Sequence, residues 1–425
     1  KFNDVLEPVC NFRVTVGPKE EYAGVEKTEL EGVTFYFIDN EYYFGYRNTL
    51  YGHYDDGERY GFFDNAVLSM FEAVDFFPEI IHCNDWQTGL IPYLYKTKYQ
   101  YRKGYQKIKT ILTIHNIAYQ GRFSKELMPY LDVEYSNDLE FDNLINFLKT
   151  GIVTADFVTT VSENYATEIL HDYFGFGMEN VLNDRKDTLF GIVNGIDYTN
   201  FNPKLDPKIS FNFGLHNYLK GKALNKEALQ NYFELDNNDR PMIGMVSRLT
   251  EAKGFDLVMD VVEELVSKGD IQFVLLGSGD AYIEEYFQNL QMKYPKNVGV
   301  YIGYNEEMAR KIYASVDMFL MPSRFEPCGL AQLISLKYGT VPVIRKTGGL
   351  RDTIEIYNKF TGEGTGFGFE NYDAFDMLFA INNALEVYGD KPSWKKIVRR
   401  GMQADFSWLE SAKKYVALYK KLKGE

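Results

Sequence analysis

Short apolar runs alternate with longer amphipathic stretches along most of the chain. The apolar runs have the length of buried strands and lie at residues 33–38, 80–83, 110–114, 157–161, 189–193, 243–247, 273–276, 298–302, 318–321 and 341–344. Between them, helical periodicity marks residues 65–76, 253–267 and 281–292. Apolar strands separated by helices form parallel sheets that are covered on both faces. The pattern therefore predicts an α/β fold with two doubly wound sheets.

The two predicted sheets divide the chain into an N-terminal domain, residues 1–196, and a C-terminal domain, residues 197–404. A polar segment at 197–239 is the predicted boundary region. Ligands of open parallel sheets bind at the carboxyl ends of the strands, so two facing sheets predict one site in the cleft between them. Only two short apolar runs precede residue 40, with an acidic linker between them. We therefore expect the first strand–helix unit of the N-terminal domain to be missing.

Composition and charge exclude several classes of protein. With 425 residues, 45% of them hydrophobic and 25% charged, the chain is neither disordered nor a coiled coil. Its net charge of −14 argues against nucleic acid as a partner, and no apolar run approaches the ~20 residues that span a membrane. Three widely spaced cysteines, Cys10, Cys83 and Cys328, favour a reducing cytoplasm over a disulfide framework.

Several common catalytic motifs are absent from the sequence. It contains no G-x-x-x-x-G-K-[ST] phosphate loop, no H-E-x-x-H and no C-x-x-C. The nearest dinucleotide fingerprint, at residues 277–280, lacks its third glycine and is interpreted as a turn. No Asp-x-Asp pair occurs, which removes the usual carboxylate clamp for a metal on a nucleotide diphosphate. We therefore expect no metal and no cofactor.

Two segments that leave predicted strands of the C-terminal half carry groups suited to an anion. Arg248 and Lys253 follow one strand and either hold an anionic group or solvate the loop. Gly348 and Gly349 follow another, and either let backbone N–H groups converge on a phosphate or form a tight turn with positive φ. The motifs alone leave both choices open. A third segment, residues 322–331, places Glu326 in a loop beside a cation, and here the functional interpretation is favoured.

Two polar clusters follow strands of the N-terminal half. Residues 115–121 begin with His115 and Asn116, and residues 82–86 contain His82 and Asp85. A single histidine is usually a satisfied core or loop residue. Two polar clusters at neighbouring strand ends favour a shared cleft instead.

Together these segments resemble the bacterial glycogen synthase and plant starch synthase family of glycosyltransferases. The resemblance covers nearly the whole chain, in matching order and spacing, and is carried by residues 82–86, 115–121, 194–197, 247–254, 299–304, 322–330, 347–353 and 405–408. It implies two facing Rossmann-like domains of the GT-B type, with the C-terminal helix at 405–425 completing the first domain. It also implies metal-free transfer of glucose, with retention, to the non-reducing 4-hydroxyl of an α-1,4-glucan. The implied donor is ADP-glucose by analogy with bacterial relatives, although the sequence does not distinguish it from UDP-glucose.

The resemblance also implies roles for individual residues. Arg248 and Lys253 would hold the leaving phosphate, Glu326 would stabilise the sugar, and the His115 carbonyl would lie near the anomeric carbon. The implied donor-binding residues are Asn194, Tyr304, Cys328, Gly329, Leu330, Ala331, Thr347, Gly348 and Gly349. The implied acceptor-binding residues are Asp85, Asn116, Tyr119 and Tyr51. No metal ligand is implied.

The sequence departs from the family pattern at two places. The Lys-x-Gly-Gly-Leu turn with which family members begin is absent, and Ala331 stands where many relatives carry threonine. Two other classes therefore remain as alternatives. One is an α-glucan hydrolase with paired carboxylates, which leaves Arg248 unexplained. The other is a non-catalytic glucan-binding protein, which is favoured only if the N-terminal segment is truly absent.

Overall fold

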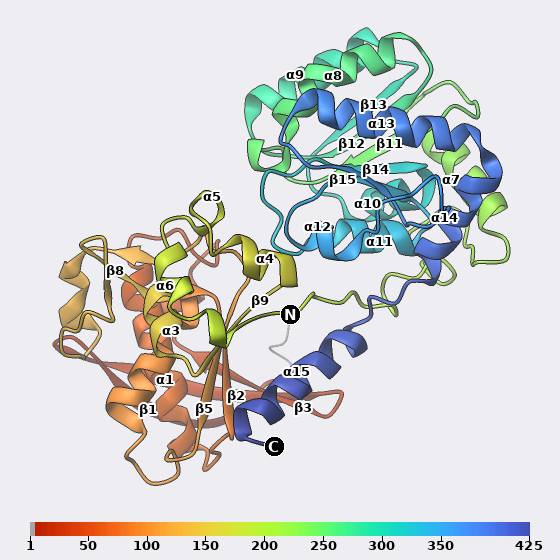
Figure 1. Cartoon of the computed structure of the whole chain (residues 1–425). Coiled ribbons are helices and arrows are strands. Elements are labelled where there is room, and N and C mark those ends of the chain that lie inside the picture. Colours follow the sequence, from red (N-terminus) through yellow and green to blue (C-terminus); the bar gives the residue numbers. More distant parts are fainter. Residues whose placement is uncertain (1–4) are drawn as a thin grey trace. The chain divides into compact units, whose positions relative to one another are not determined.

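The computed structural model describes residues 5–425, which pack as two compact units (Figure 1). The first unit contains residues 5–160, Ala166–Gly191 and the C-terminal residues Val416–Glu425. The second contains Val161–Tyr165 and Ile192–Tyr415. The domain boundaries after residues 196 and 404 stay a prediction, because compact packing alone does not define where a folding domain ends.

The first unit is built on a four-stranded parallel sheet in the order β10-β9-β5-β4. Its strands are β4 (Ile80–Asn84), β5 (Lys109–Ile114), β9 (Phe157–Thr160) and β10 (Leu189–Gly191). Each corresponds to a predicted apolar run. The helices that belong to this unit wholly or in part are α1 (Asp56–Ala73), α2 (Ile91–Leu94), α3 (Phe147–Thr154), α4 (Glu163–Glu168), α5 (Asp172–Gly175), α6 (Glu179–Asn183) and α15 (Trp408–Lys423).

Two antiparallel sheets also belong to the first unit. They consist of β1 (Glu7–Val16), β2 (Lys19–Leu30) and β3 (Val33–Asp39), and of β6 (Arg122–Phe123), β7 (Glu140–Phe141) and β8 (Leu144–Asn146). The prediction that residues 33–38 join a parallel sheet is therefore wrong, and the predicted acidic linker before them is β2. Gly17 (φ 60°) and Gly32 (φ 79°) adopt left-handed backbone, so each turn folds the chain back onto the strand it has just left.

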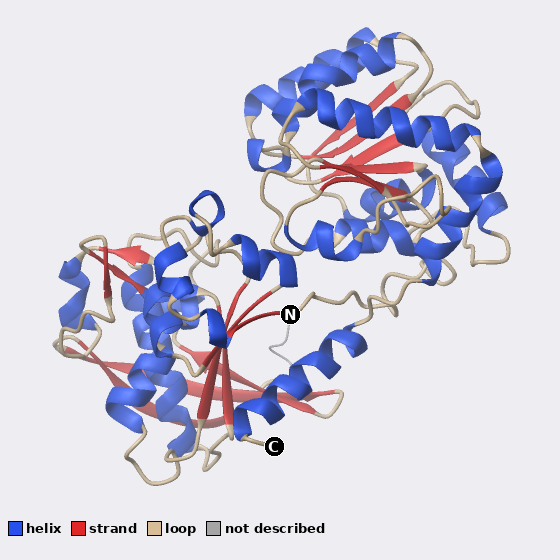
Figure 2. Cartoon of the chain, in the orientation of Figure 1, coloured by secondary structure: helices blue, strands red, loops and turns tan. Residues whose placement is uncertain are grey.

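The second unit contains a six-stranded parallel sheet in the order β13-β12-β11-β14-β15-β16. Its strands are β11 (Met242–Val246), β12 (Gln272–Gly277), β13 (Val298–Ile302), β14 (Met318–Met321), β15 (Val341–Arg345) and β16 (Phe367–Phe369). Helices flank this sheet, as Figure 2 shows. They are α7 (Tyr218–Tyr232), α8 (Phe255–Ser267), α9 (Ala281–Lys293), α10 (Glu306–Ser315), α11 (Ala331–Lys337), α12 (Gly348–Thr353), α13 (Ala374–Gly389) and α14 (Lys391–Gln403).

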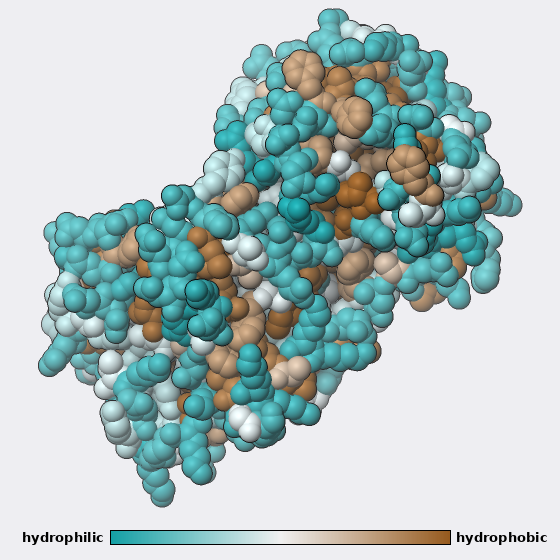
Figure 3. Space-filling model, in the orientation of Figure 1, coloured by the Kyte–Doolittle hydropathy of each residue, from teal (hydrophilic) through white to brown (hydrophobic). Residues whose placement is uncertain are grey.

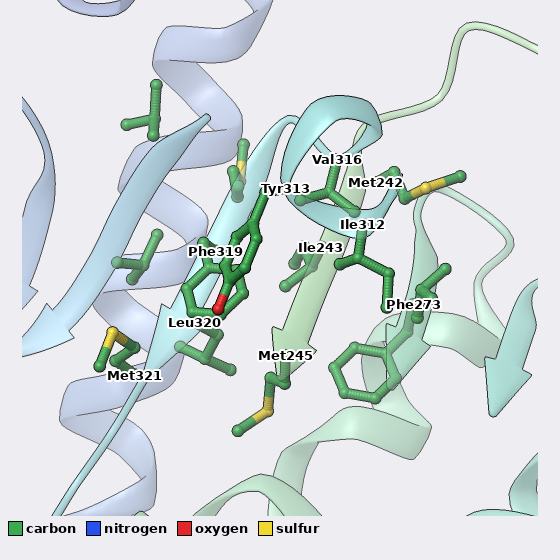
Figure 4. Close-up of a cluster of buried hydrophobic side chains, with 14 of the residues drawn as sticks. Met242, Ile243, Met245, Phe273, Ile312, Tyr313, Val316, Phe319, Leu320 and Met321 are labelled. Atoms are coloured by element: carbon green, nitrogen blue, oxygen red, sulfur yellow. The ribbon is translucent and has the colours of Figure 1, made fainter. Parts of the chain in front are cut away.

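The core of the second unit explains why most of its strands could be predicted from the sequence. Strands β11, β12 and β14 are buried on both faces, and their side chains pack against α10 (Figure 4). Ile243, Phe319 and Ile312 are all at most 2% exposed. A strand that is covered on both sides reads as a continuous apolar run, so five of the six strands coincide with predicted runs. Strand β16 was not predicted, because its two phenylalanines are separated by a glycine and form no continuous apolar run.

Helix α7 lies inside the segment predicted to be a polar boundary region. The buried positions of this helix include polar residues, among them Asn225, Lys226 and Gln230. Asn225 accepts hydrogen bonds from the backbone N–H groups of Ser210 and Phe211 and so ties the preceding loop to the helix. Polar residues that are buried for such a purpose reduce the apolar periodicity by which an amphipathic helix is recognised.

The surface seen in Figure 3 is mainly hydrophilic, with scattered apolar side chains. Within residues 5–425 no helix has both the length and the apolar character needed to cross a membrane.

Candidate functional site

In the second unit, the predicted donor-side residues follow the carboxyl ends of the parallel strands. Arg248 follows β11, Tyr304 follows β13, Glu326 follows β14 and Thr347 follows β15. Parallel strands of one sheet all end at the same edge, so segments far apart in the sequence meet there.

One cavity at this edge brings together five of the predicted residues. It has a volume of about 230 Å³, and its lining includes Arg248, Lys253, Glu326, Leu330 and Ala331. Leu330 and Ala331 stand at the start of α11, where the first N–H groups of a helix have no partner within the helix. Cations, a carboxylate and helical N–H donors therefore line one small space.

The Glu326 carboxylate is 7% exposed and has two partners. Its Oε2 accepts from Lys253 Nζ at 2.7 Å and from the Ser323 hydroxyl at 2.8 Å. A buried carboxylate that is held by a cation and a hydroxyl is fixed in direction. Neither the Lys253–Glu326 pair nor the role of Ser323 was predicted from the sequence. The serine lies in the same quoted run as Glu326, but nothing in its spacing marks it.

A second cavity, of about 340 Å³, adjoins the first and shares Arg248 with it. Its lining includes the apolar side chains Phe201, Tyr313 and Ile334, and Tyr304. The Tyr304 ring is 89% exposed. The two cavities together suit a ligand with a flat apolar group at one end and an anion at the other.

Arg248 is the exposed cation at the junction of the two cavities. Its guanidinium makes no hydrogen bond or ion pair with any residue between 5 and 425. Lys253, in contrast, already neutralises Glu326. Arg248 therefore offers five N–H donors to an incoming anion without first giving up a partner.

The Gly348-Gly349 turn packs directly against the loop that carries Glu326. Gly348 has φ 45°, and a Cβ atom there would lie 2.0 Å from the Glu326 carbonyl oxygen. A Cβ on Gly349 would lie 2.2 Å from the Cys328 carbonyl oxygen, and the Gly349 N–H donates to the Glu326 carbonyl at 3.1 Å. Close packing therefore requires glycine at both positions, and the positive φ adds to this requirement at Gly348. This supports the tight-turn interpretation, while a direct contact of Thr347, Gly348 or Gly349 with donor stays a prediction.

Cys328 and Gly329 form the part of this loop that leads into α11. Burial raises the pKa of the Cys328 thiol to about 12, so the thiol remains protonated at neutral pH. The backbone of Asn194 lies close to the Cys328 sulfur, so another predicted donor-side residue is found at this loop. Gly329 has φ 73° and makes the turn before the helix.

In the first unit, the predicted acceptor-side residues gather at the ends of β4 and β5. Asp85 has φ 59°, an unusual value for a residue other than glycine. Its N–H donates to the Thr113 carbonyl at 2.9 Å, and its Oδ1 accepts from the His115 N–H at 2.8 Å. Burial raises the pKa of the Asp85 carboxyl. The strained backbone is thus held by hydrogen bonds to the next strand.

An aromatic group lies beside Asp85. The Tyr51 ring centroid is 6.5 Å from that of Trp86 and 6.5 Å from that of Tyr119. Tyr51 and Tyr119 are about half exposed, whereas Trp86 is buried. Asn116 closes the turn before Tyr119 by accepting from the Ala118 N–H. The four predicted acceptor residues are therefore all close to one another or to Trp86, whose part in this group was not predicted.

His82 was noted in the sequence without a role, and the structure gives it a buried one. One ring nitrogen contacts the Tyr419 hydroxyl of α15 at 2.7 Å, and the other contacts the Thr113 hydroxyl at 2.6 Å. Burial, with a smaller contribution from His115, lowers the pKa of His82 to about 4. His82 therefore ties the end of α15 to β4 and β5 as a neutral side chain.

Within residues 5–425, no cluster of three or more His, Cys, Asp or Glu side chains is arranged to hold a metal ion.

Comparisons with known proteins cover both halves of the chain. Residues 1–184 match the family described as the starch synthase catalytic domain, and residues 230–400 match glycosyl transferases group 1. A glycogen synthase of Anoxybacillus flavithermus is 45% identical over 98% of this chain and 87% of its own length. A glycogen synthase of Bacillus cereus is 47% identical over 98% of this chain and 88% of its own length.

Solved structures give the same result. The catalytic domain of starch synthase IV from Arabidopsis thaliana, bound to ADP and acarbose, superposes with a TM-score of 0.91. It is 31% identical, and the match covers 100% of this chain and 90% of that one. Sucrose-phosphate synthase from Thermosynechococcus elongatus is 18% identical with a TM-score of 0.57, over 88% of this chain and 80% of that one, and supports the fold alone.

Proposed function

The chain belongs to the glycogen and starch synthase family of glycosyltransferases, and from this we propose that it extends an α-1,4-glucan from ADP-glucose with retention of configuration. The predicted resemblance, the α/β fold of the GT-B type and the assignment as a glycosyltransferase of the glycogen synthase type are confirmed. The family uses a nucleotide-sugar donor and a glucan acceptor. The identity of the nucleotide and the role of each residue belong to the proposal.

ADP-glucose is the proposed donor, and UDP-glucose is the alternative. The starch synthase IV structure holds ADP, and the 340 Å³ cavity beside Arg248 provides apolar walls and the exposed Tyr304 ring for a base. Aromatic stacking and apolar burial favour the larger purine. This preference predicts a lower KM for ADP-glucose than for UDP-glucose.

The residues of the 230 Å³ cavity would stabilise the leaving group. Arg248 and Lys253 would hold the diphosphate, and the N–H groups of Leu330 and Ala331 would add donors. Charge-assisted hydrogen bonds are worth ~1.5–3 kcal/mol each. Because these cations come from the chain itself, the proposal includes no metal and no other cofactor.

Glu326 would act on the sugar rather than on the phosphate. Positive charge develops on the glucose ring as the bond to phosphate breaks, and a carboxylate fixed beside the ring would stabilise that charge. Lys253 would then be shared between Glu326 and the departing phosphate. Cys328 remains a protonated thiol, which removes it as a nucleophile. We therefore favour attack of the acceptor hydroxyl on the same face as the leaving phosphate.

The first unit would supply the acceptor side. Asp85 and Asn116 offer polar groups to glucan hydroxyls, and Tyr51 and Tyr119 offer aromatic faces to sugar rings. The His115 backbone carbonyl is the proposed neighbour of the anomeric carbon.

The cytoplasm is the proposed location. The three cysteines are free, which suits a reducing compartment, and the relatives described above are bacterial glycogen synthases.

The single observation that carries the proposal is the cavity in which Arg248, Lys253 and Glu326 meet, in a chain nearly half identical to glycogen synthases. The test is nucleotide release with glycogen as acceptor, run in parallel with ADP-glucose and UDP-glucose. Transfer releases nucleotide only when donor and glucan are both present. A hydrolase would release sugar from glycogen without nucleotide, and a binding protein would release neither.

A further inference from the structure

The loop at residues 47–55, which we call the Tyr51 loop, exposes large side chains next to the acceptor-side aromatic group. Tyr51 is 49% exposed, Leu50 81% and Tyr54 95%. Exposed aromatic side chains on a mobile loop lose much of their binding value, because ligand binding must then also order the loop. The contacts that fix the conformation of this loop therefore determine how well its aromatic side chains can bind a ligand.

Arg59 of α1 anchors the loop. This arginine is buried, with 2% of its surface exposed. Its Nη1 donates to Asp56 Oδ1 at 2.5 Å, and its Nη2 donates to the Leu50 carbonyl at 3.3 Å. Its Nε donates to the Tyr43 carbonyl at 3.0 Å. One guanidinium thus joins the helix, the Tyr51 loop and the segment before the loop.

Asp56, the buried partner of Arg59, also acts on the loop. Its Oδ2 accepts from the Gly52 N–H at 2.6 Å and from the His53 N–H at 3.1 Å. Gly52 has φ 95°, which is needed for the chain to bring these two N–H groups onto one oxygen. The two residues that follow Tyr51 are therefore fixed by a carboxylate. The carbonyl of Leu50, which precedes Tyr51, accepts from both the Arg59 guanidinium and the Tyr60 hydroxyl.

A buried ion pair such as Asp56–Arg59 contributes little to the stability of the folded protein by itself. Desolvation of two charges offsets most of their attraction, and apolar replacements of such pairs are often neutral or stabilising. Here Asp56 directs its second carboxylate oxygen to the backbone of one loop, and Arg59 directs Nη2 to the same loop and Nε to the segment before it. The observation that needs explaining is therefore the fixed conformation of the Tyr51 loop.

We propose that Asp56 and Arg59 are positioning residues that present Tyr51 to the glucan acceptor. Tyr51 is the aromatic of this loop whose ring contacts Trp86 and Tyr119, next to Asp85. The anchor sets the direction of this ring before glucan arrives, so binding does not have to order the loop. The inference rests on the proposed function for the identity of the acceptor, an α-glucan chain.

Arg59→Lys tests the proposal, because an ammonium keeps the charge but cannot reach three acceptors in the geometry of a planar guanidinium. We expect the KM for maltoheptaose to rise about tenfold, while the KM for ADP-glucose and the kcat at saturating glucan stay within about twofold. Calorimetric titration of maltoheptaose, without donor, is expected to show the same loss of affinity.

Arg185→Lys is the matched control. Arg185 also lies in the first unit and donates to the backbone carbonyls of Ile152, Val153, Ala155 and Asp156, none of them in the Tyr51 loop. The Arg185→Lys substitution is expected to lower the melting temperature without changing the KM for maltoheptaose. If Arg59→Lys behaves like Arg185→Lys, the role of Arg59 is structural only and the proposal is wrong.

Gly52→Ala keeps the test decisive if Arg59→Lys does not fold. A Cβ on Gly52 would meet no atom within 4 Å, so only the φ of 95° opposes it and the core is untouched. We expect the same selective rise in the KM for maltoheptaose, and an unchanged value overturns the proposal.

If the wild-type protein binds maltoheptaose but transfers no glucose, the proposed function fails while the binding comparison still decides this inference. If the wild-type protein does not bind maltoheptaose, the inference fails.

Discussion

Glu326→Ala is expected to remove nearly all transferase activity while the protein remains folded. The carboxylate is 7% exposed, lines a cavity of about 230 Å³ and is fixed in direction by Lys253 and Ser323, so its charge is preorganised. Removing one preorganised electrostatic group from such a site typically costs ~10²–10³ in kcat, or ~2.7–4 kcal/mol. We expect a loss of that size.

Donor binding should not be weakened by Glu326→Ala, in contrast to the loss of kcat. Lys253 Nζ, 2.7 Å from Glu326 Oε2, loses its partner in the variant and becomes free for the donor phosphate. The KM for ADP-glucose is therefore expected to stay the same or fall. A loss of kcat without a rise in donor KM would mark a group that acts in the transition state.

The loss of stability caused by Glu326→Ala can be bounded from the Lys253–Glu326 ion pair. The Lys253 side chain is 23% exposed, so the pair lies between the surface and the buried cases, and its loss is expected to cost ~1–2 kcal/mol. For a unit of this size that corresponds to a fall in melting temperature of ~2–8 °C.

Steady-state nucleotide release and thermal unfolding would measure both quantities. Glu264→Ala, which removes the carboxylate of an exposed Glu–Lys pair on α8 in the same unit, is the control and should change neither by much. A Glu326→Ala protein that keeps more than about a tenth of the wild-type kcat would refute the electrostatic role, because that residual rate is far above the ~10²–10³ loss expected.

Three further outcomes are expected. Glucosyl transfer should persist in excess chelator, and its loss there with recovery on adding magnesium would show that Arg248 and Lys253 do not suffice. Because burial lowers the pKa of His82 to about 4, the unfolded chain binds more protons than the folded one below the usual histidine pKa of ~6.5. The stability from neutral His82 is therefore complete above pH ~6.5 and is lost as pH falls toward 4. Chemical denaturation should show a smaller loss over this range for His82→Gln, and an unchanged slope would contradict the assignment. Gly349→Ala should lower both stability and kcat, since its Cβ would lie 2.2 Å from the Cys328 carbonyl oxygen. Wild-type values for both would show that the turn does not fix the Glu326 loop.

Buried parallel strands were predictable, because burial on both faces makes each a continuous apolar run with its ligand-binding residues at the carboxyl end. That is why Arg248, Glu326 and Asp85 could be placed at strand ends from sequence. Strand β2 and helix α7 were not predictable in this way. In β2, polar residues at both ends leave only Ala23–Val25 as a short apolar run. The buried polar residues of α7 serve contacts that exist only in the folded protein.

The partners of the site residues were harder still to predict. Lys253 and Glu326 are 73 residues apart, and Ser323 joins them only because the loop folds back. The Asp56–Arg59 pair is close in the sequence, but its spacing resembles an ordinary helix-surface ion pair. Only burial and the hydrogen bonds to the Tyr51 loop distinguish it.

The most direct test of the central claim is the product formed from ADP-glucose and maltoheptaose. Mass spectrometry should show release of ADP together with acceptors that are longer by whole glucose units. Proton NMR should show that each new linkage is α-1,4, as in the acceptor. Free glucose without chain extension, or a β-linked product, would contradict the account.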